Sequence, residues 1–490
     1  MSLKRNKETI SSENDVKIKR VAPEVSLRSQ LSDENLKSKL FESWTSGKDL
    51  ILAPDIEFRS EPFRHCVIRN FCHDADFLEG LKEELYDVEY SEKSNDLYQF
   101  HQSIDLGSSQ SPHIVSLHNF FHECLIGWLR SVTGIPLNHK IDVTSSRYDY
   151  TDVLLCHDDQ CEGRRIAFIL YMVNSWEKED GGTLDLFDID DYGQPDKVAR
   201  SLVPQWNSIV FFEVSHLSFH QVSEVLTRDK TRLSVSGWFH GPPLRPPTPY
   251  MSMPFPRKLP CDGECDEIAA WVNPSYLEHA TQAAIRAKFE SDSEILLQDF
   301  LRPEKYVELA EALALEDLPW TCRGPPNRRN YEISREGLPS IVQSFLKLLN
   351  SPALFEFMAA VTELDLLPNR NEEASSSSDE KRRKMKGPAC TAEVQRWQHR
   401  SYTLVFDKDP TFEQPGLDAV LYFNSHLWTE GAGGQTSYIA RDADEELLTV
   451  FPVDNALALT YRDKETLRFV KYLNCETEGA FQSIFCTYYE

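Results

Sequence analysis

The stretch 154–159 reads Leu-Leu-Cys-His-Asp-Asp, an apolar, strand-like run that ends in the pattern His-x-Asp. If the end of the run stays extended, side chains two residues apart lie on the same face, so His157 and Asp159 project together. An imidazole nitrogen and a carboxylate oxygen on one face are two of the three ligands in the 2-His-1-carboxylate sites that hold Fe(II). Because a chain with 14 His is expected to contain such a pair by chance, the pattern needs support from its surroundings.

Two features downstream supply that support. The strand-like run 218–222 (Ser-Phe-His-Gln-Val) offers a second imidazole in His220, and Arg232 opens another strand-like run. A buried arginine needs an anion, and its guanidinium can grip a carboxylate with two hydrogen bonds. The spacing therefore favours an iron site formed by His157, Asp159 and His220, with Arg232 as the anchor for the far carboxylate of a dicarboxylate co-substrate.

Two of these residues have alternatives. His216 is another imidazole near His220, although it lacks the strand context and the spacing to the arginine. A surface ion pair with Asp229 or Glu224 is the alternative role of Arg232.

The first half of the chain places helical patterns before strand-like runs. The helical patterns cover 75–85 and 115–133, and short strand-like runs separated by Gly, Pro and Asp turns cover 153–156, 165–173, 208–214 and 233–239. Many short strands of this kind predict a β-sandwich or a β-barrel.

The second half of the chain repeats features of the first. The run 67–71 is echoed by 296–300 at an offset of 229 residues (300 − 71), and Trp176 with its following Gly-Gly is echoed by Trp428 at an offset of 252 (428 − 176). An insertion the size of segment 368–390 explains most of the difference between the two offsets. The pattern predicts two copies of one domain.

The second copy lacks the residues that carry chemistry in the first. Asp407-Lys408-Asp409 stands where His157-x-Asp159 stands, Phe469 stands near the position of His220, and Phe481 near that of Arg232. Without imidazoles and a basic anchor, this copy is expected to bind neither iron nor the dicarboxylate. Its strand-like runs favour a structural or partner-binding role.

Composition excludes several classes of protein. The formal charge of 52 − 78 = −26 argues against direct binding of nucleic acid by phosphate neutralisation and favours encounter with a basic protein. The longest strongly apolar stretch, Ile166 to Val173, is far below the ~18 residues that a membrane span needs. Eleven scattered Cys are typical of a reducing compartment.

Shifts in composition divide the chain. Residues 1–35 are polar and charged and are predicted to form a disordered arm, and 36–242 are predicted to form the first domain. A Pro-rich connector is expected over 243–270. The second domain is expected over 271–490, with a disordered, low-complexity loop at 368–390.

The whole pattern resembles a known family. His-x-Asp, then about sixty residues, then His and Arg is the order found in Fe(II)- and 2-oxoglutarate-dependent oxygenases, and the longer run of motifs is similar to the ribosomal prolyl-hydroxylase family. The motifs that carry the resemblance lie at 151–159, 162–171, 211–214, 218–225 and 232–241. The resemblance implies an α+β fold of two tandem double-stranded β-helix (jelly-roll) domains flanked by helices, the second domain being degenerate.

The resemblance also implies roles for single residues. His157, Asp159 and His220 match the iron ligands, and Arg232 matches the residue that pairs with the distal carboxylate of 2-oxoglutarate. Tyr171 and Tyr148 match tyrosines near that carboxylate, although a plain core position is the alternative for Tyr171. Tyr148 is nine residues from His157, so strict strand alternation places the two on opposite faces unless a bulge or turn intervenes.

The function implied by the resemblance is hydroxylation of a prolyl C3 position in a basic small-subunit ribosomal protein, with an effect on translation accuracy and termination. The implied cofactors are Fe(II), 2-oxoglutarate, O₂ and L-ascorbate, and translation-termination factors are expected as further partners. The alternatives are a non-catalytic acidic scaffold in translation or stress response and an oxygenase with a different protein substrate. Localisation in nucleus and cytoplasm is expected. The basic clusters at 4–5 and 17–20 fit a split nuclear-import signal, and an ordinary solvated tail is the alternative.

Overall fold

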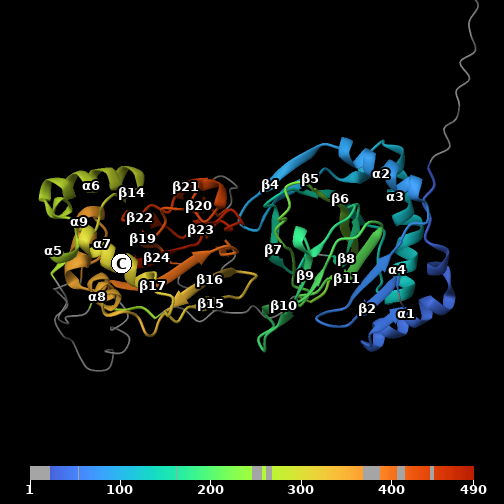
Figure 1. The fold of residues 1–490 in the computed structure, drawn as a ribbon, viewed down its shortest axis with the longest axis horizontal. Helices are drawn as coiled ribbons and strands as arrows, with labels where there is room; N and C mark the ends of the chain where they lie inside the picture. The colour runs from blue at the N-terminus through green and yellow to red at the C-terminus, as the bar shows by residue number, and fades with distance from the viewer. Residues whose placement is uncertain are drawn as a thin grey trace, which may run out of the picture.

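The structure is a computed structural model, and it describes residues 23–490 except 53, 162, 246–255, 261–266, 368–386, 406–413 and 442–445. Two antiparallel sheets, each with its own set of helices, follow one another along the chain (Figure 1). This arrangement confirms the predicted α+β class.

The first sheet has the strand order β1-β2-β3-β11-β8-β13-β6-β5-β7-β12-β9-β10, with β4 paired to β5. Its strands are β1 (Leu50–Leu52), β2 (Ile56–Arg59), β3 (His65–Arg69), β4 (Tyr90–Ser94), β5 (Tyr98–Ser103), β6 (Ile141–Tyr148), β7 (Val153–His157), β8 (Arg164–Tyr171), β9 (Leu184–Ile189), β10 (Pro195–Leu202), β11 (Ser208–Glu213), β12 (His220–Val222) and β13 (Arg232–His240).

The second sheet has the order β14-β22-β19-β24-β17-β16-β18-β23-β20-β21, with β15 paired to β16. Its strands are β14 (Glu294–Leu297), β15 (Thr321–Arg323), β16 (Arg329–Ser334), β17 (Ala389–Gln398), β18 (Tyr402–Thr403), β19 (Gly416–Phe423), β20 (Thr436–Ala440), β21 (Glu446–Val450), β22 (Leu457–Arg462), β23 (Thr466–Val470) and β24 (Ala480–Tyr489).

The helices lie on the outer side of each sheet, and strands β4 and β7 face β20 and β23 in the middle of the molecule (Figure 1). The first set is α1 (Glu34–Ser46), α2 (Ala75–Asp87), α3 (Pro112–Phe120) and α4 (Ile126–Thr133). The second set is α5 (Ile268–Trp271), α6 (His279–Asp292), α7 (Pro303–Leu313), α8 (Ser340–Leu349) and α9 (Pro352–Thr362).

The predicted helices and strands of the first half are confirmed with small shifts at their ends. Helix α2 begins where Asp74 accepts hydrogen bonds from two backbone N–H groups of the first turn, and it buries Phe77, Leu78, Leu81 and Leu85. The pattern at 115–133 forms α3 and α4, joined by a π-helical turn at Phe121–Leu125.

The two sheets share local contacts as well as strand order. The side chain of Asn207 accepts from the backbone N–H of Cys72 and donates to its carbonyl, and Asn455 makes the same pair of bonds with Leu301. The indole N–H of Trp176 donates to the carbonyl of Gly181, five residues on, and that of Trp428 donates to Gly433. The repeated sequence features therefore occupy repeated positions in the two sheets.

Some predicted boundaries differ from the structure. The prediction of a disordered arm over residues 1–35 is wrong for its last part. Ser29–Ser32 forms a 3-10 helix, and the carbonyl of buried Leu31 accepts a hydrogen bond from the indole of Trp128. Helix α5 begins at Ile268, inside the expected connector, and β17 begins at Ala389, inside the expected loop. The basic clusters at 4–5 and 17–20 and most of the 368–390 loop lie outside the described residues.

None of the helices in the described part of the chain combines the length and the apolar character that crossing a membrane requires.

Candidate active site

Strand β7 delivers the first two predicted ligands. It ends at His157, and Asp159 follows with a φ of 61°, in the left-handed region that Asp tolerates better than most residues. The end of the run does not stay extended, because β7 ends at His157 and the backbone of Asp159 is left-handed. The turn still brings the two side chains together: the Nε2 atom of His157 lies 3.3 Å from Oδ1 of Asp159.

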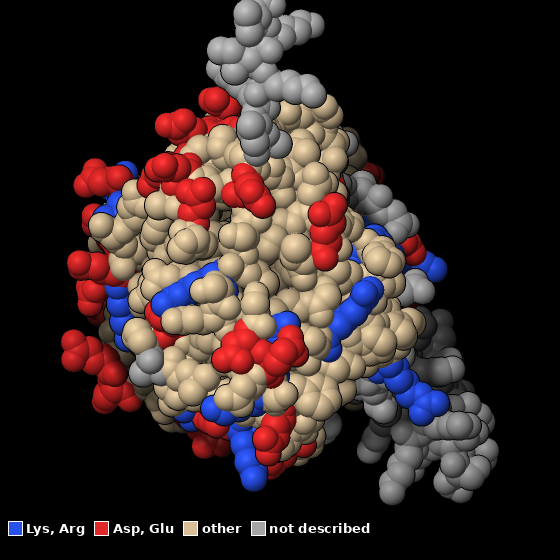
Figure 2. All heavy atoms as spheres, turned by 90° about the vertical axis from the view of Figure 1, so that its right-hand side faces the viewer, with Lys and Arg blue, Asp and Glu red and all other residues tan. Residues whose placement is uncertain are grey.

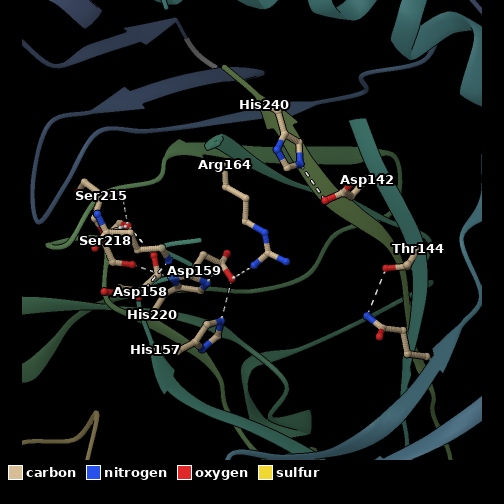
Figure 3. Close-up of polar contacts among 12 residues, drawn as sticks. Asp142, Thr144, His157, Asp158, Asp159, Arg164, Ser215, Ser218, His220 and His240 are labelled. Carbon is tan, nitrogen blue, oxygen red and sulfur yellow. Dashed lines mark hydrogen bonds and ion pairs between the residues drawn. The ribbon is translucent and has the colours of Figure 1, made fainter. Parts of the chain in front are cut away.

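Strand β12 delivers the third. Its first residue, His220, pairs with His157 in the ladder between β12 and β7. The Nε2 atom of His220 lies 3.3 Å from Oδ2 of Asp159, so both imidazoles converge on one carboxylate (Figure 3). The ligand atoms of His157, Asp159 and His220 all lie within 4.8 Å of one another, and His216 is not part of this group.

Backbone carbonyls fix the orientation of both imidazoles. The Nδ1 atom of His157 lies 2.8 Å from the carbonyl of Leu155, and Nδ1 of His220 lies 2.8 Å from the carbonyl of Ser218. A carbonyl accepts only from an N–H, so Nδ1 carries the proton in each neutral ring and Nε2 is left with its lone pair. This is the arrangement that a metal-binding histidine needs.

Charge in the site is concentrated on Asp159. Burial favours the neutral acid, but the imidazoles of His220 and His157 together hold the pKa of Asp159 well below its usual value. Burial works against protonation of His157, but the neighbouring carboxylate raises the pKa of that imidazole above its usual value. A buried carboxylate between two imidazoles is thus a preformed cation site.

Arg232 is buried with one side of its guanidinium engaged. Its side chain is 1% exposed, and Nε donates to the carbonyl of Gly182 at 2.7 Å, so the surface ion pair is excluded. Within the described residues, neither its Nη2 atom nor the buried hydroxyl of Tyr171 has a hydrogen-bond partner. Buried polar groups are nearly always hydrogen-bonded, so these two atoms fit a site for a carboxylate.

The two predicted tyrosines flank that guanidinium. The carbon at its centre lies 5.0 Å from the ring centre of Tyr148 and 5.1 Å from that of Tyr171. Tyr148 pairs with Arg232 across the ladder of β6 and β13, and a turn separates it from β7, which answers the question of strand alternation. Burial raises the pKa of both phenols, so both keep the proton that a hydrogen bond to a carboxylate needs.

Sequence reasoning missed a residue next to the metal-ligand group. The guanidinium of Arg164 lies 3.9 Å from Oδ1 of Asp159 (Figure 3). The carbon at its centre lies 3.5 Å from the ring centre of Trp238. Its position in the sequence, at the start of a strand, carries no signal of this contact. Nε2 of His240 lies within hydrogen-bond distance, 2.8 Å, of Oδ2 of Asp142 (Figure 3).

A second group of metal-ligand atoms is formed by His101, Asp149 and Asp152. Asp149 is already held by Arg147 at 3.2 Å and by the hydroxyl of Thr231 at 2.6 Å, and Asp152 accepts the backbone N–H of Asp149. These bonds give the cluster a role in holding the turn between β6 and β7.

The second sheet replaces the site with other chemistry. In the first sheet, Arg232 lies two residues before Ser234, which pairs with Tyr171. In the second sheet, Phe481 pairs with Trp397 and lies two residues before Ser483, which pairs with Tyr422. Phe481 thus takes the register position of Arg232, as predicted.

The expected match of Phe469 to His220 is off by one residue. In the first sheet, His220 pairs with Leu186, and Leu186 follows Gly181 by five residues. In the second sheet, Arg468 pairs with Tyr438, and Tyr438 follows Gly433 by five residues. Arg468 lies 3.0 Å from the buried carboxylate of Asp418, so an ion pair stands where the first sheet gathers imidazoles. A cavity of about 940 Å³ lies beside it, and residues 407–409 lie outside the described residues.

Comparisons with known proteins agree with this chemistry. Residues 143–240 match the family described as the 2OG-Fe(II) oxygenase superfamily, and residues 263–490 match the one described as oxoglutarate and iron-dependent oxygenase degradation C-term. The chain is 44% identical over 467 residues to the Xenopus laevis protein named Prolyl 3-hydroxylase OGFOD1, covering 91% of this chain and 90% of that one.

Two further relatives have the same kind of name. Prolyl 3-hydroxylase OGFOD1 of Mus musculus is 42% identical over 506 residues, covering 92% of each chain. Prolyl 3-hydroxylase sudestada1 of Drosophila melanogaster is 34% identical over 472 residues, covering 88% of this chain and 84% of that one.

Proposed function

The chain belongs to the family of these prolyl 3-hydroxylases, within the 2OG-Fe(II) oxygenases, and from that premise we propose that it hydroxylates the C3 position of a prolyl residue in a small-subunit ribosomal protein. One observation carries the enzymatic part of the proposal: two imidazoles and a carboxylate converge in the same half of the molecule as the buried Nη2 atom of Arg232 and the hydroxyl of Tyr171, neither of which has a hydrogen-bond partner among the described residues. Fe(II), 2-oxoglutarate and O₂ are the cofactors of this family, and L-ascorbate is proposed as a further one.

The residues present fit these groups. His157, Asp159 and His220 would hold Fe(II), and Arg232 with Tyr171 and Tyr148 would hold the far carboxylate of 2-oxoglutarate. When bound, the iron and its co-substrates supply the oxidising power that inserts one oxygen atom of O₂ into a C–H bond and the other into succinate, with release of CO₂.

The chain itself contributes orientation and exclusion of water. The carbonyls of Leu155 and Ser218 keep the Nε2 lone pairs of His157 and His220 aimed at one point. Phe212 packs on the ring of His220, with ring centres 4.7 Å apart, and shields that side of the site. Arg164 balances part of the charge of Asp159 from the other side.

The proposal extends to the folds of the two sheets. Each would be a double-stranded β-helix, the first catalytic and the second degenerate. The shared strand order and the paired asparagine and tryptophan contacts support this assignment.

The charge of the molecule supports a basic protein as the substrate. The chain carries a net charge of −26, and Asp and Glu gather along one edge of the face shown in Figure 2. Complementary charge speeds encounter and favours basic partners. Translation-termination factors as partners, an effect on translation accuracy, and residence in nucleus and cytoplasm are proposed with it.

Mass spectrometry of small-subunit ribosomal proteins tests the substrate. Cells that express the wild-type chain should show a prolyl peptide heavier by one oxygen, and cells that carry His157→Ala should show the unmodified peptide. If only a peptide from another protein is modified, the chain is still an oxygenase, but the proposed ribosomal substrate is wrong. Unchanged modification with the His157→Ala variant would reject the proposal.

A further inference from the structure

We infer that Glu224 is a positioning residue for the 2-oxoglutarate site and that the second half of the chain, residues 267–490, holds it in place. The inference rests on the proposed function and adds to it a role for the half that lacks the iron ligands. It follows from two sets of contacts, one made by the side chain of Glu224 and one by its backbone.

The side chain of Glu224 is bound by the second half. It is a carboxylate only 4% exposed, on the segment that leaves β12. Its Oε1 atom accepts the backbone N–H of Cys475 at 2.7 Å, and its Oε2 atom lies 2.6 Å from Nε2 of His399 and accepts the hydroxyl of Tyr472 at 3.2 Å. A buried carboxylate is stable only when it is hydrogen-bonded, so these three groups fix where Glu224 lies.

The backbone of Glu224 leads to the guanidinium of the site. Its carbonyl accepts the N–H of Gly182 at 3.0 Å, and the carbonyl of Gly182 accepts Nε of Arg232 at 2.7 Å. The backbone of Gly182 fits closely here, because a Cβ atom at that position would lie 2.9 Å from Cδ of Arg232. One residue, Gly182, therefore links the residue that the second half holds to the residue that would grip 2-oxoglutarate.

The hydrogen bonds from Glu224 through Gly182 to Arg232 control the direction in which the guanidinium points. Two parallel hydrogen bonds to a carboxylate require the fork to lie in the plane of its partner, so a small shift of the Gly182 carbonyl loses both. Outer residues that orient binding groups in this way are typically worth about 10- to 100-fold in affinity or activity. The two histidine ligands are oriented by the carbonyls of Leu155 and Ser218 instead. Loss of the contacts to Glu224 should therefore weaken binding of 2-oxoglutarate more than binding of the metal.

A second contact between the same two halves offers a matched control. Arg228, four residues beyond Glu224, donates to Glu476 at 2.7 Å, with side chains 66% and 37% exposed. This pair also joins the two halves, but it lies at the surface and has no bond to Gly182 in the described structure. Loss of the pair should weaken the contact between the halves without turning Arg232.

The test compares three full-length proteins: the wild type, Tyr472→Phe combined with His399→Ala, and Glu476→Gln. Calorimetry under nitrogen measures the Kd of Mn²⁺, as a stand-in for iron, and then the Kd of 2-oxoglutarate for the Mn²⁺-loaded protein. The double variant should raise the Kd of 2-oxoglutarate by about 10-fold or more. Its Kd for Mn²⁺, and both constants of Glu476→Gln, should stay within about twofold of the wild type.

Each outcome decides something. A wild type that binds no 2-oxoglutarate overturns the proposed function itself. A wild type that binds it, with a double variant of equal affinity, overturns the inference and leaves the function standing. Equal weakening of Mn²⁺ and 2-oxoglutarate also overturns it, because the contact would then be merely structural. If the double variant does not fold, Tyr472→Phe alone, which removes one hydroxyl, is judged by the same comparison.

Discussion

At the scale of single residues, the site depends on groups held in unfavourable surroundings. Asp159 takes a left-handed backbone conformation between two imidazoles, and Arg232 is buried with its Nη2 atom left without a hydrogen bond among the described residues. Such arrangements persist only where neighbouring contacts fix them and where a ligand can complete them. The chemistry of these residues is therefore sensitive to the loss of single atoms.

Arg232→Ala should strongly weaken binding of 2-oxoglutarate while leaving the metal ligands intact. The variant removes a guanidinium that is only 1% exposed and lies between Tyr148 and Tyr171, where it can donate to a carboxylate. We expect a KM for 2-oxoglutarate at least about 100-fold higher in a succinate-release assay, which is about 2.7 kcal/mol. Arg228→Ala, at the surface, is the control, and an unchanged KM for Arg232→Ala would remove the assigned role.

His65 gives the fold a dependence on acid. Burial lowers the pKa of this fully buried imidazole to about 4, so the unfolded chain, with its ordinary pKa of about 6.5, binds the proton more tightly. Stability is therefore complete above pH 6.5 and falls as the pH drops toward 4. At pH 5 the loss is about 2 kcal/mol.

Urea unfolding of the wild type and of His65→Leu at pH 7.5 and pH 5 measures this effect. The difference in unfolding free energy between the two pH values should shrink by about 2 kcal/mol in the variant. Equal pH dependence of the two proteins would mean that folding does not lower the pKa of His65.

At the scale of elements, the glycine pair between Trp176 and β9 shapes the pocket. Gly182 has a φ of 60° and lies against Arg232, and its counterpart in the second sheet, Gly434, has a φ of 86° and lies against Leu473. The two turns have the same backbone requirement, but only the first adjoins a site. A comparison of Gly182 with Gly434 therefore separates the effect of the turn on stability from its effect on binding of 2-oxoglutarate.

Gly182→Ala and Gly434→Ala should both destabilise the fold, by about 1 kcal/mol or more each, because Ala disfavours positive φ. Only Gly182→Ala should also weaken binding of 2-oxoglutarate, since its new methyl group meets Cδ of Arg232. Thermal unfolding and calorimetry of the two variants check the contrast. Equal affinities for 2-oxoglutarate would show that Arg232 moves aside freely.

At the scale of the whole molecule, the second half braces the strand that carries His157. Val153 and Leu155 of β7 form one buried cluster with Tyr402 and Leu404 of the second half. Leu155 also supplies the carbonyl that orients His157, so packing between the halves reaches the metal site through one residue. A change that weakens this cluster is thus expected to destabilise both sheets around it.

Leu404→Ala should speed hydrogen exchange of the backbone amides of β7 in the first half. The variant leaves a cavity at a site that is 3% exposed, which costs about 2 to 4 kcal/mol. Leu447→Ala, on a side chain 61% exposed, is the control and should leave exchange in β7 unchanged. If exchange in β7 is equally slow in both variants, the first half holds this strand without help.

Local sequence was sufficient for much of this molecule. Apolar periodicity and turn residues predicted several helices and strands of the first half, and the residue types His, Asp and Arg at 157, 159, 220 and 232 predicted a preference for a divalent metal and a carboxylate. The repeat was visible because equivalent contacts, such as those of Trp176 and Trp428, constrain the same residue type twice.

Tertiary structure alone decided how these groups point. Neither the left-handed conformation at Asp159 nor its contact with Arg164 was predicted. The approach of His220 to Asp159 and the bonds of Glu224 to the second half join segments far apart in the chain. Periodicity reports the local backbone, whereas the direction of a buried side chain is set by whichever distant groups satisfy its hydrogen bonds. The amino-acid sequence by itself determines which functional groups this protein has, and only the folded structure determines which of them come into contact.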